Sequence, residues 1–481
     1  MVLGFFMILV DTTIVSVANP TIMRGLDTTM VATLWATSAY LLAYAVPLLI
    51  TGRLGDRFGP RRIYLLGLAV FTLSSLACGL STSIEALIAA RVFQGLGAAL
   101  LTPQTMAVIT RIFKPRERGS AMAIWGITAG VATLVGPILG GFMLDAWGWE
   151  WIFIINVPVG VIAFVLALRF VPKLDTHAHR FDWVGVLLSA AGMFMLVFGI
   201  QEGESFDWGT IWGPVSVWGL IIAGAVVLVL FVVWQRVQRG EPLVPLEIFS
   251  DRNFSVGSGT IVMVGVSMTG MSLPLMFYLQ LVRGLTPTQS ALMLVPMAVG
   301  SVLLARPVGK LIDRRDPRRI ATLGLVLQVA SLGLFFVMMR PDTPLWMLLI
   351  PSTILGVANA FMWGPLASIT TFGLAPELAG AGSGVYNTSR QVGAVLGSAA
   401  MAVLMQSRLT AELGEAAGSG AGGEGAAGVG ALPTALHEGF SAAMGQSIFL
   451  PMAGMLAAAV ITLFFARRPE RTGQVAVVAG E

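Results

Sequence analysis

The chain has 481 residues, of which 56% are hydrophobic and 11% are charged, and its mean hydropathy is +0.84. Soluble domains carry about 25% charged residues, so this composition excludes an ordinary soluble globular protein. A backbone in hydrocarbon must satisfy its own hydrogen bonds, so long apolar runs without strand-like alternation indicate an all-α integral membrane protein rather than a β-barrel. The net charge of +4 does not indicate nucleic-acid binding, because the basic residues lie in short loops between apolar segments.

Apolar stretches of about 20 residues predict the membrane-spanning helices. Counted in chain order, they give fourteen spans. The predicted spans are residues 2–22, 33–51, 62–80, 84–111, 120–143, 151–171, 183–201, 213–234, 254–281, 290–308, 319–339, 345–370, 379–405 and 441–466. The start has no basic region and Asp11 interrupts its apolar run, so we interpret it as a helix rather than a cleaved signal.

The distribution of basic residues predicts the orientation of these spans. With the N-terminus inside, most of the 29 Lys and Arg residues fall in inner loops or at inner segment ends. The exceptions lie in outer loops (Arg24, Arg283, Arg340, Arg408) or within spans (Arg91, Arg306, Arg390). The positive-inside rule therefore predicts a multi-pass protein of the cytoplasmic (inner) membrane, with both termini in the cytoplasm.

An internal repeat predicts the domain organisation. Residues 52–62 read GRLGDRFGPRR and residues 309–319 read GKLIDRRDPRR, and each copy follows a long apolar run. Two membrane half-bundles that carry the same loop at the same point explain this recurrence. We predict six-helix bundles at residues 1–171 and 253–466, with the two remaining spans in residues 172–252.

Two polar segments are predicted to lie outside the membrane. Residues 467–481 form a cytoplasmic tail, and residues 406–440 form an external loop. Within that loop, residues 412–430 consist mostly of Gly, Ala and Glu, a composition that buries too little surface to fold. We expect this segment to be mobile.

Six motifs in order resemble those of the fourteen-helix drug:proton antiporter family of the major facilitator superfamily. The first repeat loop at 52–62 is joined by VDTTIVSVANP (10–20), RVFQGLGAA (91–99), GPILGG (136–141), WEWIFIINVPVG (149–160) and PLVPLEIF (242–249). The resemblance covers essentially the whole chain. It implies a major facilitator fold and export of lipophilic compounds in exchange for protons.

Asp11 is the candidate proton carrier. It lies near the middle of the first span, where an ionised carboxylate costs about 2.5–3.5 kcal/mol unless it meets water or a partner. Burial favours the neutral acid, so an acid that is wetted from one side and occluded afterwards can carry a proton. The family resemblance assigns this position to coupling. The alternative is a hydrogen-bonded acid that only ties helices together.

Arg91 is the candidate partner of Asp11. At about 1.5 Å per residue, Arg91 lies roughly 10 Å and Asp11 roughly 15 Å from the outer ends of their spans, so the two can meet directly or through water. A nearby guanidinium lowers the proton affinity of the carboxylate, and motion that separates the pair would raise it again. Gln94 can join this network through its amide. A static buried ion pair is the alternative.

The span at 120–143 is the candidate gate helix. Small residues let another helix pack closely, and a proline removes one backbone hydrogen bond. The residues concerned are Gly130, Gly136, Pro137, Gly140 and Gly141. Taken alone they indicate ordinary helix packing. By resemblance, their pattern accompanies exporters and suggests a role in the direction of transport.

The repeat loops are predicted to form a cytoplasmic latch that stabilises one conformation. Gly52 and Gly309 can end helices, and the two aspartates can accept bonds from arginines or from the next helix. The latch residues are Gly52, Asp56, Arg57, Arg61, Arg62, Gly309, Asp313, Arg314 and Arg318. The positive-inside rule alone explains the charges but not the recurrence of Gly, Leu, Asp and Pro.

The second half departs from the pattern of exporters of multivalent cations, because its spans contain no Asp or Glu in their central portions. Arg390 is the central charge there. An anionic or neutral lipophilic substrate is therefore at least as plausible as a cation. The candidate cavity residues are Asn359, Trp363, Asn387, Arg390 and Gln391. In the alternative reading, Arg390 only clamps neighbouring carbonyls and hydroxyls.

Other kinds of chemistry find no support in the sequence. There is no nucleotide-binding G-x-x-x-x-G-K-[ST] loop, no recognisable catalytic constellation and no predicted cofactor. His177, His179 and Asp175 fit a solvated linker better than a metal site, and the lone Cys78 excludes an intrachain disulfide and a cysteine-based metal cluster. We expect a non-enzymatic monomer whose partners are protons, membrane lipids and a lipophilic small molecule or lipid. The remaining alternatives are an exporter of a lipid or cell-envelope precursor, and a non-transporting scaffold or receptor.

Overall fold

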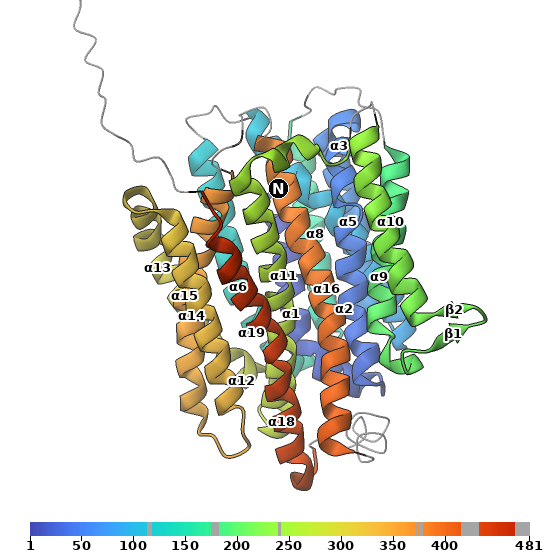
Figure 1. The fold of residues 1–481 in the computed structure, drawn as a ribbon, viewed down its shortest axis with the longest axis vertical. Helices are drawn as coiled ribbons and strands as arrows, with labels where there is room; N and C mark the ends of the chain where they lie inside the picture. The colour runs from blue at the N-terminus through green and yellow to red at the C-terminus, as the bar shows by residue number, and fades with distance from the viewer. Residues whose placement is uncertain are drawn as a thin grey trace, which may run out of the picture.

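The computed structural model describes residues 1–112, 118–172, 174, 182–238, 242–371, 374, 379–414 and 432–466. Its long helices run roughly parallel to one another (Figure 1). In chain order the helices begin with α1 (Val2–Gly25), α2 (Met30–Ala45), α3 (Leu48–Phe58), α4 (Pro60–Gly79), α5 (Ile84–Ile112), α6 (Arg118–Trp147), α7 (Trp151–Ile154), α8 (Asn156–Phe170), α9 (Trp183–Gln201) and α10 (Val217–Val237). They continue with α11 (Arg252–Phe277), a π-helix (Tyr278–Val282), α12 (Pro287–Leu292), α13 (Val295–Arg314), α14 (Pro317–Met338), α15 (Leu345–Thr371), α16 (Ala379–Leu413), α18 (His437–Ser447) and α19 (Phe449–Thr462).

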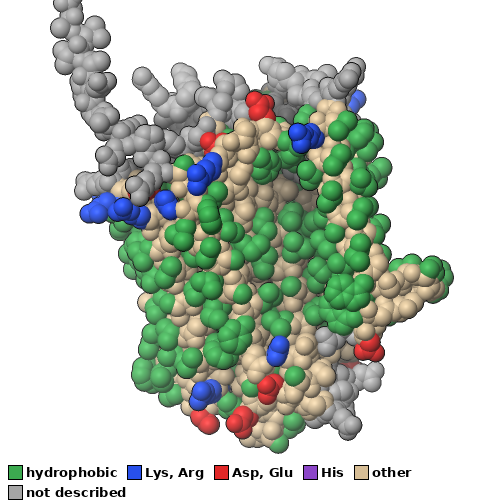
Figure 2. All heavy atoms as spheres, in the orientation of Figure 1, with side chains coloured by type: hydrophobic (Ala, Val, Ile, Leu, Met, Phe, Trp, Pro, Cys, Tyr) green, Lys and Arg blue, Asp and Glu red, His purple; other side chains and the backbone are tan. Residues whose placement is uncertain are grey.

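Most of these helices belong to segments that could span a membrane. Within the described ranges, 12 helical segments are long and apolar enough to cross a membrane. The two remaining predicted spans fall on α2 and α6, which contribute the shorter apolar segments 30–45 and 135–147. Figure 2 shows a broad apolar surface, with basic side chains along the upper rim, at the end that carries α3 in Figure 1. The nearly all-helical fold agrees with the predicted fold class, while the number of fourteen spans remains a prediction.

Four predicted spans are each divided between two α-helices in the structure. The span at 151–171 comprises α7 and α8, the span at 441–466 comprises α18 and α19, and in the other two the division lies beside a proline. The span at 33–51 is divided into α2 and α3 around Pro47, and the span at 290–308 is divided between α12 and α13, just before Pro296. Proline has no backbone N–H, and its ring clashes with the carbonyl of the preceding helical turn. Because the helical hydrogen bond at a proline is already lost, a helix is easily interrupted there. A count of apolar residues alone does not detect such a break.

Helices α1–α8 form what we call the first group, and glycines bring several of its helices close together. A Cβ on Gly97 of α5 would lie 2.8 Å from Cα of Phe71 on α4, and one on Gly67 would lie 2.7 Å from Cβ of Leu100. In the second group, α11–α19, Gly393 and Gly397 of α16 pack against the backbone of α11. Close backbone approach at small residues is the usual mode of helix association in membranes.

Helices α9 and α10 form a hairpin that a buried acid closes. Asp182 Oδ1 accepts hydrogen bonds from the Gly185 amide (2.8 Å) and from Trp234 Nε1 (2.7 Å), and Oδ2 accepts one from Gln235 Nε2 (2.6 Å). Gln235 in turn accepts a bond from the Val244 amide (3.1 Å). At the other end lies a short antiparallel ribbon of β1 (Thr210–Trp212) and β2 (Val215–Ser216).

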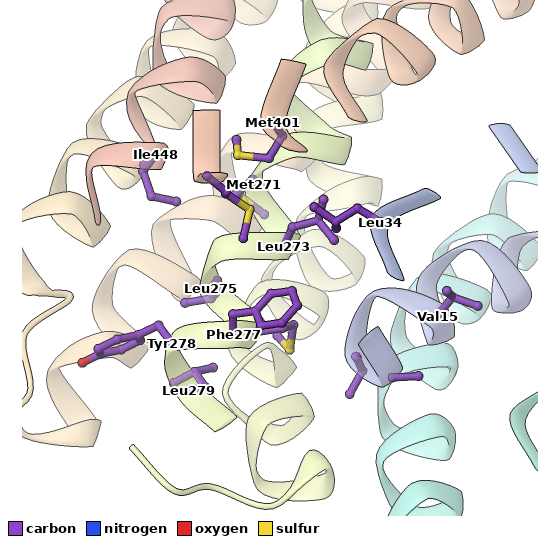
Figure 3. Packing of buried hydrophobic residues seen from close by; sticks show 14 of the residues in the cluster. Val15, Leu34, Met271, Leu273, Leu275, Phe277, Tyr278, Leu279, Met401 and Ile448 are labelled. Carbon is purple, nitrogen blue, oxygen red and sulfur yellow. The ribbon is translucent and has the colours of Figure 1, made fainter. Parts of the chain in front are cut away.

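Apolar packing connects the two groups. A single cluster of buried residues includes Val15 and Leu34 from the first group, and Met271 and Met401 from the second (Figure 3). Among the described residues, three hydrogen bonds also connect the groups. One joins the Ser38 and Ser398 hydroxyls (2.7 Å), one runs from Gln280 Nε2 to the Val17 carbonyl (2.9 Å), and one runs from the Thr288 amide to Asp145 Oδ2 (3.1 Å). Helices α1, α2 and α6 therefore carry the contacts that any relative motion of the groups must change.

Candidate functional site

The candidate site is built around Asp11, which is fully buried in α1. Arg91 of α5 donates from one terminal nitrogen to Asp11 Oδ2 at 2.7 Å. Gln94 Nε2 donates to Asp11 Oδ1 at 2.9 Å, and Asn156 Nδ2 of α8 donates to the same oxygen at 3.3 Å. Both carboxylate oxygens are thus held by donors from other helices, an arrangement that compensates a buried negative charge.

Arg91 is held as firmly as the acid that it contacts. Only 1% of its surface is exposed, and its Nε donates to the Ala36 carbonyl of α2 at 3.2 Å. A terminal nitrogen also donates to Gln94 Oε1 at 2.6 Å. The guanidinium carbon lies 3.9 Å from the centre of the Tyr40 ring, within the range of a favourable cation–π contact. The site therefore joins α1, α2, α5 and α8.

The sequence prediction brought together Asp11, Arg91 and Gln94, and missed three other members of the site. Asn156 and Ser75 extend the network, with Asn156 Nδ2 and Gln94 Nε2 both donating to the Ser75 hydroxyl at 3.0 and 3.1 Å. Tyr40 supplies the aromatic face. Asn156 lies in the motif at 149–160, where an isolated amide within an apolar run was the available signal.

A network of this kind can hold a carboxylate in the membrane interior and can also release it. Protonation of Asp11 removes the charge that attracts Arg91, and both oxygens would then need a different set of bonds. Because three of the donors lie on α5 and α8, a change at the acid acts on the packing of α1 against those helices. The network is thus suited to couple ionisation to helix position.

Three of the predicted gate glycines lie at close helix contacts. Gly136 faces the Thr13 side chain and Gly140 faces Ile14, both on α1, while Gly141 faces the second group. A Cβ on Gly141 would lie 2.6 Å from Cα of Thr288 in α12. Nearby, Asp145 accepts a hydrogen bond from the Thr288 amide at 3.1 Å.

The other two predicted gate residues, Pro137 and Gly130, also belong to α6. Pro137 is buried inside the helix, whereas the surroundings of Gly130 are outside what the structure describes. At Gly136, Gly140 and Gly141, therefore, α6 packs against α1 and α12 without room for larger side chains.

The prediction that Gly52 and Gly309 end helices is wrong. Gly52 lies within α3 and Gly309 within α13, and α3 instead ends at Gly59, which has a positive φ of 93°. Glycine adopts this backbone conformation without the steric cost of a Cβ, so the later glycine is the better helix terminator. In the second copy, Asp316 caps α14 by accepting from the Arg318 amide at 3.0 Å.

The remaining latch residues are only partly described. The side chains of Asp56, Asp313 and Arg314 lie outside what the structure describes. Arg57 and Arg62 are exposed. Arg61 and Arg318, which occupy the same position in the two copies, each donate to a backbone carbonyl, of Leu168 and Leu463 respectively.

The predicted cavity residues are distributed over two helices. Asn359 of α15 accepts a bond from Gln328 of α14 at 2.7 Å, and Trp363 on the same helix is 36% exposed. Asn387, Arg390 and Gln391 lie on α16. Within the described ranges, no hydrogen bond joins Asn359 to Arg390.

The portion of the chain that the structure covers contains no group of three or more His, Cys, Asp or Glu side chains that could hold a metal ion. The loose set Asp175, His177 and His179 lies outside that portion.

Comparison with known proteins identifies the family. Residues 1–398 match the Major Facilitator Superfamily. An uncharacterized MFS-type transporter of Mycobacterium tuberculosis is 51% identical over 468 residues, which cover 96% of this chain and 79% of the relative. The tetracenomycin C resistance and export protein of Streptomyces glaucescens is 34% identical, over 96% of this chain and 89% of its own length.

Solved structures agree with this assignment at the level of fold. The D-xylose-proton symporter has a TM-score of 0.64 at 13% identity, over 97% of this chain and 96% of its own. A bacterial homologue of the human lysosomal transporter Spinster has a TM-score of 0.62 at 19% identity, over 96% and 95% of the two chains. The contact of Asp11 with Arg91, the close helix packing and the repeated loop thus lie in a major facilitator fold, and the chain belongs to the Major Facilitator Superfamily of membrane transporters.

Proposed function

We propose that the protein is a proton-coupled antiporter of the fourteen-helix drug-exporter type, which expels lipophilic compounds across the cytoplasmic membrane. The observation that carries the proposal is the fully buried Asp11 carboxylate, held by Arg91 and Gln94 in a helix that also contacts the second group. Relatives named as resistance and export proteins support the direction and the substrate class, including the multidrug resistance protein Stp of Mycobacterium tuberculosis, 33% identical over 85% of this chain.

In the proposed cycle, Asp11 alternates between two states. While the site is closed, the ionised acid is paired with Arg91. When the opening turns outward, a proton from outside neutralises Asp11, which weakens the ion pair and favours the opposite arrangement of α1 against α5. Release of the proton to the cytoplasm restores the pair. The acid thereby links the proton gradient to the change of access.

The larger parts of the molecule have matching proposed roles. Residues 1–171 and 253–466 rock against each other as halves, with residues 172–252 inserted between them and both termini in the cytoplasm. The repeat loops act at the cytoplasmic end, and α6 acts as the gate helix where Gly141 meets Thr288. The compound passes between the halves, from the cytoplasm or the inner leaflet, in a functional monomer.

The substitution Asp11→Asn tests this proposal. It keeps the size of the side chain and removes the ionisable group, so we expect proton-driven efflux to be abolished while expression and membrane insertion are retained. The measurement is substrate efflux from vesicles under an imposed pH gradient. The control is Asp27→Asn, because Asp27 is exposed after the end of α1, and its positive φ of 48° is one that asparagine tolerates.

Efflux by the Asp11→Asn protein at the native rate would refute coupling through this residue. If the native reconstituted protein also moved no solute, a scaffold or receptor would be the better account. Ordered lipid between the halves, or loss of an envelope lipid on deletion of the gene, would favour a lipid or cell-envelope precursor as substrate.

A further inference from the structure

Arg390 lies at the junction of the two groups. It belongs to α16, which packs against α2 and is joined to it by the hydrogen bond between Ser38 and Ser398. Its guanidinium is within electrostatic range of the Tyr44 hydroxyl on α2 and of the Tyr386 hydroxyl one turn earlier on α16. Counted from the start of α16, Arg390 lies about 17 Å along the helix, well inside the membrane-spanning part.

Among the described residues, the charge on Arg390 has no counter-ion. The chain as described contains no ion pair and no hydrogen bond from this guanidinium to another residue. Its side chain is half-buried, so part of the group remains accessible. A guanidinium offers five N–H donors, and an unpaired charge at this depth in the membrane is costly. A negatively charged group on a bound molecule would supply both the missing counter-charge and the missing hydrogen-bond acceptors.

A second unsatisfied group lies beside Arg390. The Tyr386 hydroxyl is buried and has no hydrogen-bond partner, although buried hydroxyls are normally paired. Tyr386 and Arg390 are four residues apart and so lie on the same face of α16. Tyr44 of α2, whose hydroxyl is hydrogen-bonded to the Thr102 hydroxyl at 2.8 Å, contributes a further polar side chain from helices α1–α8.

The surrounding charges favour an anion. Asp11 and Arg91 neutralise each other. The spans after residue 253 contain no Asp or Glu in their central portions, so the positive charge of Arg390 is not balanced there. Because electrostatic interactions are strong away from water, this charge repels a cationic compound and attracts an anionic one.

We propose that Arg390, Tyr386 and Tyr44 bind the oxyanion of an amphiphile, such as a carboxylate or phosphate on an otherwise apolar molecule. As a statement about the exported compound, this rests on the transport function proposed above. The site is also close to the proton site: the rings of Tyr44 and Tyr40 are 6.0 Å apart, and Tyr40 stacks on Arg91. Tyr44, beside Arg390, and Tyr40, beside Arg91, therefore lie on the same face of α2. An anion bound at Arg390 would contact this face.

The test uses three fluorescent probes with the same tail: dansylaminoundecanoate, its methyl ester and the corresponding trimethylammonium compound. Binding to the purified full-length protein is measured by dansyl fluorescence, without a proton gradient. We expect the carboxylate to bind most tightly. Arg390→Gln should weaken carboxylate binding about tenfold and leave ester binding unchanged, because the substitution removes a charge-assisted hydrogen bond.

Two further variants keep the test independent of folding. Tyr386→Phe removes a hydroxyl that has no partner in the protein, so the fold should persist while carboxylate affinity falls severalfold. Arg306→Gln is the matched control, since Arg306 is an exposed arginine on another membrane helix, α13, and should not affect the probes.

Several outcomes would overturn the proposal. They are equal affinity of the native protein for the three probes, an equal loss of carboxylate and ester binding in Arg390→Gln, and displacement of the probe by inorganic phosphate as effective as by unlabelled undecanoate. The last result would indicate a site for a free anion. Asp11→Asn should retain the preference for the carboxylate, so failure of proton coupling and failure of anion recognition give different results.

Discussion

Arg61 and Arg318 occupy the same position in the two repeat loops and make the same kind of contact. Arg61 donates to the Leu168 carbonyl near the end of α8, and Arg318 donates to the Leu463 carbonyl immediately after α19. Carbonyls at the end of a helix lack intrahelical partners and carry partial negative charge, so a cation stabilises them. In this conformation, these two arginines bind helix ends within their own groups.

Removal of either arginine should therefore lower stability. We expect Arg61→Gln and Arg318→Gln each to reduce the free energy of unfolding by about 1 kcal/mol, the usual net value of a hydrogen bond. The two effects should add, because the sites are far apart. Thermal unfolding in detergent measures both, with the exposed Arg62→Gln as control. An equal loss in the control would show that the carbonyl contacts contribute nothing specific.

The ion pair at the proposed coupling site predicts a strong dependence of stability on both partners. Arg91→Gln leaves the Asp11 carboxylate buried without its cation, which should cost about 3–5 kcal/mol. The double variant Asp11→Asn with Arg91→Gln has no buried charge to compensate and should recover much of this loss. The measurement is thermal unfolding of the single and double variants. Additive losses would contradict a direct interaction between the two side chains.

The sequence was sufficient to predict the centre of this site. Charged residues inside a membrane are rare, which drew attention to Asp11 and Arg91. Their similar depths along their spans then indicated that the two side chains could meet. Asn156 and Ser75 were missed because a single uncharged polar residue in an apolar run is compatible with packing as well as with function. Tyr40 was missed because its contribution depends on how α2 is rotated, which hydropathy does not specify.

The helix boundaries show a different limit. A count of apolar residues treated 33–51 as one span, although Pro47 separates α2 from α3. It also gave no reason to prefer Gly59 over Gly52 as the residue that ends α3, because the choice depends on which glycine adopts a positive φ. Composition predicts that a helix exists, whereas local backbone geometry decides where it ends.

The α9–α10 hairpin should depend on Asp182. In Asp182→Asn, one side-chain oxygen is replaced by an amide nitrogen, so a donor would face either Gln235 Nε2 or the Gly185 and Trp234 donors. An unsatisfied buried donor costs about 1–3 kcal/mol. We expect the α9–α10 hairpin to become more sensitive to proteolysis, and Asp251→Asn, which can retain the acceptor oxygen for the Phe254 amide, to have less effect. Equal sensitivity of the native and Asp182→Asn proteins would disprove the role of the cluster.

The contact between Gly141 and Thr288 predicts how the balance between open and closed states can be shifted. A methyl group at position 141 would lie 2.6 Å from Cα of Thr288 and 2.8 Å from the Pro287 carbonyl oxygen, both of which are backbone atoms that cannot rotate away. Gly141→Ala should therefore destabilise the state in which α6 touches α12 by about 1–3 kcal/mol. A destabilisation of that size changes the ratio of the two states about fivefold or more.

Distances between spin labels on α6 and α12 measure this shift. Trp147→Cys and Leu292→Cys provide exposed attachment points, at 57% and 50% exposure, and the native Cys78 is buried and so is protected from labelling. Gly259→Ala is the matched control, because a Cβ at that position of α11 meets no atom within 4 Å. We expect longer distances in Gly141→Ala and native distances in the control. Unchanged distances in Gly141→Ala would mean that α12 moves with α6, so that this contact does not separate as access changes.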